Sequence, residues 1–275
     1  ARNGSRRRNG CGTSSMSRSS GWTPDPVTVA GRNFAIIAGS GFASFADDAA
    51  GKHVDTEYGA PSGPIRELRY VDHKVLFLPR HGDDLMIPPH AINYRANLKA
   101  LSLSGVDSVI ALNTVGVIKP KLHPGQVAIP DQLIDYTWGR ASSIYDGGVP
   151  IDHVDFTAPF SAPLREALLQ SAQTAGVEVV DGGVYAVTQG PRLETEAEVD
   201  RLERDGGDYV GMTAMPEAVL ARELGMEYAC VSLIVNYAAG RGEQPIHEDL
   251  EAGTMTAKMQ TMKLLREFFG ATDNE

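Results

Sequence analysis

Tyr228-Ala-Cys-Val-Ser-Leu-Ile-Val235 is the longest apolar run in the chain, and Asn236 follows it directly. A short, nearly continuous apolar run with β-branched residues is typical of a strand that is buried on both faces. Such strands occur mainly in parallel or mixed sheets that helices cover on both sides. The run therefore predicts a central strand of an α/β fold that ends in a polar amide.

From Asn33 onward, short apolar runs alternate with amphipathic segments along the chain. Further strands are predicted over 34–38, 75–78, 109–112, 127–129, 133–134, 184–187 and 209–210. Helices are predicted over 91–104, 164–175, 195–204, 216–224 and 248–269, and a glycine-rich loop over 136–155. Alternating strands and helices predict one α/β domain over 31–275, with a central mixed sheet flanked by helices.

Five of the predicted strands end in short polar or glycine-rich segments. These are Gly39-Ser40-Gly41, Arg80-His81, Asn113-Thr114, Met212-Thr213 and Asn236. Ligands of open α/β sheets bind at the carboxyl ends of the strands. Arginine and glycine-flanked hydroxyl groups suit an anion such as phosphate. The segments therefore predict a shared anion-binding site.

Charge and composition exclude several classes of protein. Residues 1–30 hold five Arg and one Asp, so the net charge of −10 leaves residues 31–275 strongly acidic. An acidic body disfavours nucleic-acid binding, which depends on neutralising phosphates. No apolar run approaches the roughly 18 to 20 residues of a membrane span. Two cysteines, Cys11 and Cys230, cannot form a disulfide framework, so we expect a cytoplasmic protein with neither a membrane nor a nucleic-acid partner.

The basic N-terminal segment, residues 1–30, differs from the rest of the chain. It lacks the apolar middle of a secretory signal. We expect a disordered, partly vector-derived leader with Met16 as the candidate natural start. A targeting segment and a nucleic-acid-binding arm remain as alternatives.

The chain lacks the sequence motifs that are typical of metal sites and of sites for large cofactors. His81 and His90 are nine residues apart across two prolines, a poor spacing for metal ligands. Gly39-Ser40-Gly41 lacks the third glycine of a dinucleotide fingerprint, and the chain has no P-loop. We therefore expect neither a metal nor a cofactor.

Several longer motifs, taken in order, resemble one known family. They lie at 80–82, 87–97, 190–198, 210–223 and 235–240. They are similar to segments of the trimeric purine nucleoside phosphorylases, in particular the methylthioadenosine and methylthioinosine phosphorylase branch. The resemblance runs from Ile36 to Phe269. It implies a homotrimer that cleaves the N-glycosidic bond of a purine nucleoside, with inorganic phosphate as co-substrate.

The resemblance also implies a role for individual residues. Those expected to hold phosphate are Ser40, Arg80, His81, Asn113, Thr114 and Thr213. Those expected to contact the nucleoside are Leu193, Val210, Met212, His247 and His153, the last lent by a neighbouring subunit. Glu194 and Asn236 are expected to act on the base as it leaves.

The chemistry of the base favours one class of substrate. A 6-oxopurine offers N1–H as a donor and O6 as an acceptor, whereas a 6-aminopurine reverses both. Glu194 can accept from N1–H, and Asn236 can donate to O6. In the adenine-cleaving relatives, an aspartate typically stands at the Asn236 position. The pair therefore favours a 6-oxopurine, and methylthioinosine in particular.

The group at the 5′ position of the sugar is less constrained. The segment 87–97 resembles the methylthio enzymes, whereas His247 matches a histidine that meets a 5′-hydroxyl. Leu85 replaces a histidine common in the methylthio relatives. Methylthioadenosine cleavage, inosine or guanosine cleavage, and a non-catalytic nucleoside-binding protein therefore remain as alternatives.

Overall fold

The computed structural model describes residues 31–39, 42, 50–70, 73–148, 150–243 and 246–270, without the side chains of 247–251. The predicted leader over 1–30 and Ser40 lie outside the described residues. So does the side chain of His247, although its backbone belongs to the last helix.

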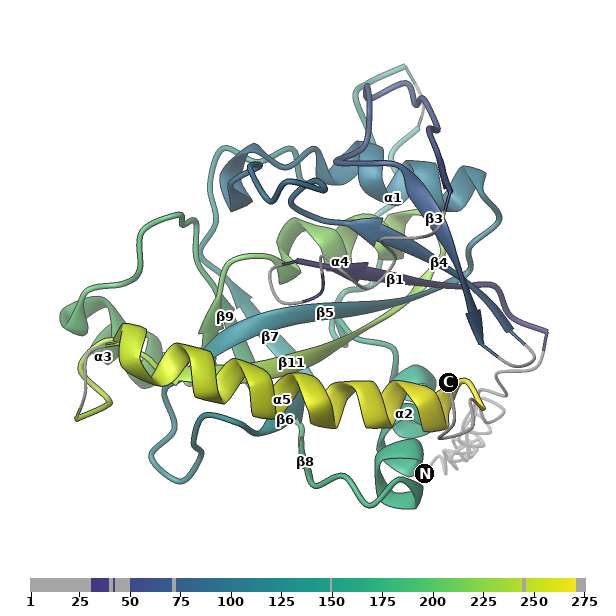
Figure 1. Ribbon diagram of the computed structural model, residues 1–275. Coiled ribbons are helices and arrows are strands. Elements are labelled where there is room, and N and C mark those ends of the chain that lie inside the picture. The colour runs from purple at the N-terminus through teal and green to yellow at the C-terminus, as the bar shows by residue number, and fades with distance from the viewer. Residues whose placement is uncertain are drawn as a thin grey trace, which may run out of the picture.

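The described residues form eleven strands, five α-helices and one short 3-10 helix (Figure 1). The strands are β1 (Phe34–Ala38), β2 (Gly51–Lys52), β3 (Ile65–Tyr70), β4 (His73–Pro79), β5 (Ser108–Val117), β6 (Val127–Ile129), β7 (Gln132–Asp135), β8 (Val179–Asp181), β9 (Val184–Val187), β10 (Tyr209–Gly211) and β11 (Glu227–Tyr237). The helices are η2 (Pro89–Ala91), α1 (Tyr94–Leu103), α2 (Ala162–Thr174), α3 (Glu196–Arg204), α4 (Ala214–Glu223) and α5 (Ile246–Phe268).

The strands form one mixed sheet, which confirms the predicted fold class. β1 lies between β4 and β5 and is parallel to both, and β11 runs parallel to β5 along its length. β10 pairs antiparallel with the far end of β5. In Figure 1, α1 and α4 cover one face of the sheet, and α2 and α5 cover the other.

The core lies in two layers because successive side chains of a strand point to opposite faces. In β1, Ala35 and Ile37 pack with the side chains of α1 and α4. Phe34 and Ile36 pack instead with those of α2 and α5. Both faces of β1 are therefore buried, as its continuous apolar sequence predicts.

Two predicted strand ends are wrong by more than one residue. β5 continues to Val117 instead of stopping at Leu112, so Asn113 and Thr114 lie inside it. Asn236 likewise lies inside β11, which ends at Tyr237. These strands continue past their apolar runs because each hydrogen-bonds to the other along its length.

The end of β1 opens a gap in the sheet. β1 pairs with β5 only as far as Leu112, and β10 pairs only with Gly116 and Val117. Among the described residues, no strand pairs with that side of β5 over 113–115. The backbone of Asn113, Thr114 and Val115 therefore lies at an open edge of the sheet.

Several local elements differ from the sequence prediction. The sequence does not predict β2, β3 and β8, because β3 has two charged residues in succession, which break the alternation of a half-buried strand, and the other two are very short. The first α-helix begins at Tyr94 because the Asn93 side chain accepts a hydrogen bond from the backbone of Ala96.

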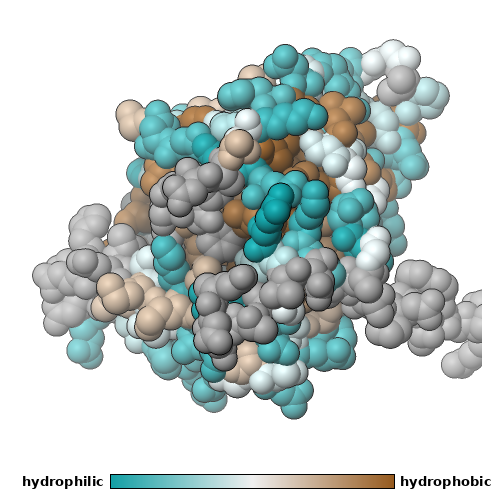
Figure 2. All heavy atoms as spheres, turned by 45° about the vertical axis from the view of Figure 1, so that its right-hand side comes forward, coloured by the Kyte–Doolittle hydropathy of each residue, from teal (hydrophilic) through white to brown (hydrophobic). Residues whose placement is uncertain are grey.

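The surface carries a mixture of polar and apolar residues. Figure 2 shows hydrophilic residues over much of the face that it presents, with apolar surface between them. No helix in the described part of the chain combines the length and the apolar character that crossing a membrane requires.

Candidate functional site

A cavity of about 230 Å³ lies at the open edge of β5. Ten of the predicted site residues line it: Arg80, His81, Asn113, Thr114, Leu193, Glu194, Val210, Met212, Thr213 and Asn236. They come from β5, β10, β11 and the segments that follow β4, β9 and β10. The fold therefore brings together residues that are up to 156 positions apart in the chain.

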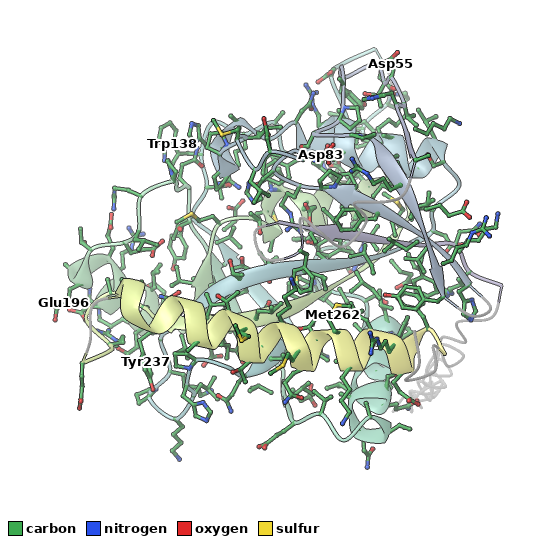
Figure 3. The ribbon with its side chains drawn as sticks, in the orientation of Figure 1. Asp55, Asp83, Trp138, Glu196, Tyr237 and Met262 are labelled. Atoms are coloured by element: carbon green, nitrogen blue, oxygen red, sulfur yellow. The ribbon has the colours of Figure 1, made fainter. Side chains whose placement is uncertain are left out.

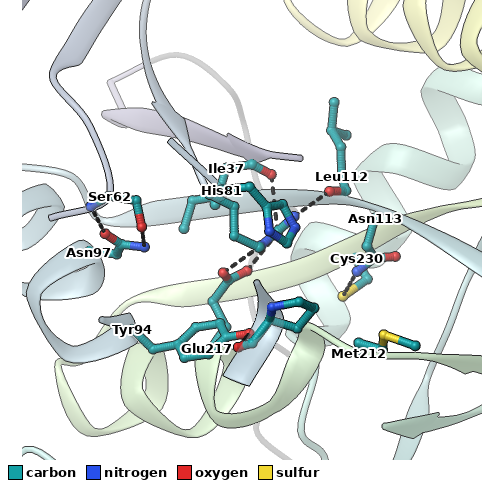
Figure 4. Close-up of polar contacts among 12 residues, drawn as sticks. Ile37, Ser62, His81, Tyr94, Asn97, Leu112, Asn113, Met212, Glu217 and Cys230 are labelled. Carbon is teal, nitrogen blue, oxygen red and sulfur yellow. Dashed lines mark hydrogen bonds and ion pairs between the residues drawn. The ribbon is translucent and has the colours of Figure 1, made fainter. Parts of the chain in front are cut away.

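Arg80 is buried at one end of the cavity. Figure 4 labels its hydrogen-bond partners Ile37, Leu112 and Glu217. Its Nε and Nη2 each donate to a carboxylate oxygen of Glu217 at 2.8 Å. Its Nη1 donates to the Leu112 carbonyl, and Nη2 also donates to that of Ile37. Only one N–H of Nη1 is left for a ligand. Arg80 thus offers one donor and a positive charge, rather than a free fork.

His81 lies beside Arg80 in a neutral state. Its Nδ1 is 2.8 Å from the Ile87 carbonyl, which can only accept, so Nδ1 carries the proton. Burial lowers the pKa of His81, and the charge of Arg80 lowers it further. Nε2 is therefore an acceptor at neutral pH and suits the hydroxyl of a monoprotonated phosphate.

A buried chain of polar side chains connects Glu217 to Asn113. The Tyr228 hydroxyl donates to Glu217, and the Cys230 thiol lies 3.7 Å from that hydroxyl. Asn113 donates from Nδ2 to the Cys230 sulfur (Figure 4). Its Oδ1 accepts from the Ser232 hydroxyl. Burial raises the pKa of the Cys230 thiol to about 12, so the thiol stays protonated. These contacts fix the Asn113 amide.

Thr213 directly precedes α4 and is buried, and its hydroxyl does not cap the helix. Met215 has an extended backbone (φ −115°, ψ 137°), so the regular part of α4 begins at Pro216, which has no N–H to offer an anion. The suitability of this end of the cavity for an anion therefore rests on the Arg80 charge and the Thr213 hydroxyl.

The other end of the cavity carries the groups predicted to meet a base. The Thr188 hydroxyl donates to Oε1 of Glu194 at 2.6 Å, which fixes the carboxylate as an acceptor. Asn236 follows a β-bulge in β11, where the register against β5 shifts between Ile234 and Asn236. Its amide fits there because Gly116 has no side chain: a Cβ on Gly116 would lie 3.1 Å from Nδ2.

Apolar residues form the wall between the two ends. A Cβ on Gly190 would lie 2.4 Å from the Met212 sulfur, so the absence of a side chain at Gly190 leaves room for Met212. Val210 is buried and Leu193 is half-exposed at the rim. The arrangement can hold an anion at one end and a flat polar heterocycle at the other.

Two residues named in the sequence analysis do not line this cavity. His153 is exposed on the long loop after β7. Leu85 is exposed with a φ of +58°. Figure 3 shows Trp138, from the same loop as His153, at the periphery of the fold.

Three residues that shape the site were not predicted from the sequence: Thr188, Glu217 and Arg140. Thr188 directly follows a predicted strand, which is the signal that identified the other site residues. Glu217 lies in a predicted helix, and nothing in its spacing indicates a partner 137 residues away. Among the described residues, no group of three or more histidine, cysteine or carboxylate side chains could hold a metal ion.

Known proteins resemble this chain along most of its length. The model of one family, the phosphorylase superfamily, matches residues 33–270. A probable S-methyl-5′-thioinosine phosphorylase from Xanthomonas campestris pv. campestris is 52% identical over 212 residues, which cover 76% of this chain and 85% of the relative. A 6-oxopurine nucleoside phosphorylase from Pyrococcus furiosus is 43% identical over 224 residues, which cover 78% and 84%.

A solved structure shares the fold. It is methylthioadenosine phosphorylase from Schistosoma mansoni in complex with adenine, with a TM-score of 0.80 and 29% identity. The match covers 87% of this chain and 91% of that one.

Proposed function

The chain belongs to the phosphorylase superfamily, and on that premise we propose that it cleaves the N-glycosidic bond of a 5′-methylthionucleoside with inorganic phosphate. The favoured substrate is methylthioinosine, and the products are hypoxanthine and methylthioribose 1-phosphate. The observation that carries the proposal is the pairing of Glu194, held by Thr188, with Asn236 in a cavity that also contains Arg80.

The two ends of the cavity match the two halves of this reaction. Phosphate attacks the anomeric carbon while that carbon develops positive charge and the purine leaves. Arg80 and neutral His81 provide the anion site, which places the nucleophile. Thr114 and Thr213 add hydroxyl groups beside it. Asn236 donates to the departing base, where negative charge develops.

Glu194 and Asn236 support a 6-oxopurine as the base. The Glu194 carboxylate accepts from N1–H, and the Asn236 amide donates to O6 or to N7. With a 6-aminopurine, acceptor would face acceptor at N1. A site that is built to pair polar groups rejects an analogue that leaves them unpaired, by a factor on the order of 10⁴.

An apolar wall supports a methylthio group at the 5′ position. Phe42, Pro89, Leu193 and Ile246 line the cavity together with the polar groups. A thioether makes favourable contacts with such side chains, whereas a 5′-hydroxyl would need a polar partner. Inosine cleavage is the second candidate, because one relative is named a 6-oxopurine nucleoside phosphorylase.

The proposal includes an assembly, a cellular location and the absence of a cofactor. We infer a homotrimer in the cytoplasm in which His153 of each subunit reaches the sugar site of its neighbour. Its exposure on the loop after β7 supports this role. The reaction itself needs only phosphate: a phosphate oxygen bonds to the anomeric carbon as the bond from that carbon to the purine breaks. The purine leaves with the electron pair and takes up a proton from solvent to give hypoxanthine.

A panel of initial rates tests the proposed function. Methylthioinosine, methylthioadenosine, inosine and adenosine are each assayed with saturating phosphate and without phosphate. We expect phosphate-dependent release of the base, fastest with methylthioinosine. A preference for methylthioadenosine would overturn the assignment of the base. A preference for inosine would overturn the assignment of the 5′ group, and binding without turnover would point to a non-catalytic protein.

A further inference from the structure

Arg140, in the loop that follows β7, makes more hydrogen bonds than any other site-region side chain described above. Its Nη1 donates to the carbonyls of Met212 and Met215 at 2.8 and 2.6 Å. Its Nη2 donates to the carbonyls of Thr188 and Gln189 at 3.3 and 2.8 Å. Backbone carbonyls of two separate segments thus share one guanidinium.

Two further contacts of Arg140 reach the Gln189 side chain and Tyr94 of α1. Nε donates to the side-chain oxygen of Gln189, and Nη1 also lies 3.2 Å from the Tyr94 hydroxyl. The guanidinium carbon lies 5.4 Å from the centre of the Tyr94 ring, within the range of a cation–π contact. Within the described part of the chain, no carboxylate forms an ion pair with Arg140.

The two segments that Arg140 joins carry opposite halves of the proposed site. Thr188 and Gln189 begin the segment that leads from β9 to Glu194, the acceptor for the base. Met212 and Met215 flank Thr213, at the anion end of the cavity. β9 and β10 are paired up to Val187 and Gly211, and the backbone N–H of Thr188 donates to the Gly211 carbonyl just beyond. Beyond that point, Arg140 donates hydrogen bonds to the backbone of both segments.

We propose that Arg140 is a positioning residue that sets the distance between the base-recognising Glu194 and the Met212–Thr213 turn, and thereby sustains base selectivity. The inference rests on the proposed function and deepens it. Arg140 does not line the cavity, so it acts through Thr188, whose hydroxyl holds Glu194. A planar guanidinium can donate in two directions at once, whereas a lysine ammonium is a single point of charge.

Arg140→Met removes the donors and keeps an apolar stem of similar length. We expect kcat/KM for methylthioinosine to fall about 100-fold, mainly through kcat, because small displacements of reacting groups cost that much. The ratio of kcat/KM for methylthioinosine over methylthioadenosine should fall by about tenfold or more, because the acceptor is no longer fixed. Arg140→Lys should recover little of either value.

Arg165→Met is the matched control. Arg165 also donates to backbone carbonyls, those of Pro130 and Ile129, and to Asp181, but it lies in α2 and does not line the cavity. We expect it to lower the midpoint of urea unfolding while leaving the selectivity ratio unchanged. The proposal would be overturned if Arg140→Met left the ratio of kcat/KM for methylthioinosine over methylthioadenosine unchanged. It would also be overturned if Arg165→Met changed that ratio as much as Arg140→Met does.

Two additions keep the test decisive. If Arg140→Met does not fold, Gln189→Ala removes one attachment and should shift the ratio in the same direction. Dissociation constants for free hypoxanthine and free adenine are measured by calorimetry on all variants, so that base selectivity is read without turnover. If the unmodified protein released the base equally well without phosphate, or did not release it at all, the proposed function would be refuted. An unaltered ratio of the two dissociation constants in Arg140→Met would refute the role of Arg140.

Discussion

At the scale of single residues, the site depends on side chains whose hydrogen bonds fix what they can still do. Oε1 of Glu194 accepts a hydrogen bond from the Thr188 hydroxyl, which leaves Oε2 to accept one from a ligand. Asn236 donates to the Tyr237 carbonyl at 2.6 Å, which leaves its second N–H for the base. The residue types already favour a 6-oxopurine, and these remaining donors and acceptors support the same preference.

His81 provides a test by pH at this scale. Burial lowers its pKa below the ordinary value, so the unfolded chain binds a proton more readily than the folded protein. The free energy of unfolding should therefore rise with pH through the window below about 6.5 and fall as the pH drops through that window. Urea unfolding of the wild type and of His81→Asn at about pH 7.5 and about pH 5.5 measures this.

The wild type should lose more stability on acidification than His81→Asn does. Both proteins are compared at one protein concentration, because assembly contributes to apparent stability. Equal losses in the two proteins would show that His81 is not the group that titrates.

At the scale of elements, an ion pair joins the end of β4 to α4. Arg80 and Glu217 are both buried, and Glu217 also accepts from the Tyr228 hydroxyl of β11. Three elements that are distant in sequence therefore meet at one carboxylate. Because Glu217 does not line the cavity, its effect on the site is exerted through Arg80.

Glu217→Gln should destabilise the fold by about 3 to 5 kcal/mol, because it leaves the Arg80 charge buried without its counter-ion. Urea unfolding measures the loss. Glu223→Gln in the same helix is the control, since Glu223 accepts hydrogen bonds only from Ser143 and the Ile144 backbone at the half-buried end of the helix. The control should cost about 1 kcal/mol. Similar losses in both variants would contradict the special role of the buried pair.

At the scale of the whole molecule, the sheet places its residues around a gap rather than along a straight edge. β1 stops beside Leu112, β10 joins at Gly116, and the open part of β5 lies between them. The cavity is open to the surface at Leu193, which is 45% exposed. A neighbouring subunit at this rim would complete the sugar site.

Assembly gives a prediction at this scale. We expect a sedimentation mass three times the 29.5 kDa of the chain. His153→Ala should keep that mass and lower kcat/KM about tenfold or more, because a group that orients the sugar is lost. A fully active monomer, or a trimer whose activity does not respond to His153→Ala, would contradict the proposal.

The sequence by itself determined the α/β class, the order of most elements and the family, because these depend on local periodicity and on short motifs. It identified Arg80, Glu194 and Asn236 in the same way. The tertiary structure decided what those residues can do. Arg80 is committed to Glu217, and Arg140 joins two segments that lie 48 to 75 positions further along the chain. Such pairings follow from packing and burial, and no local pattern in the sequence encodes them.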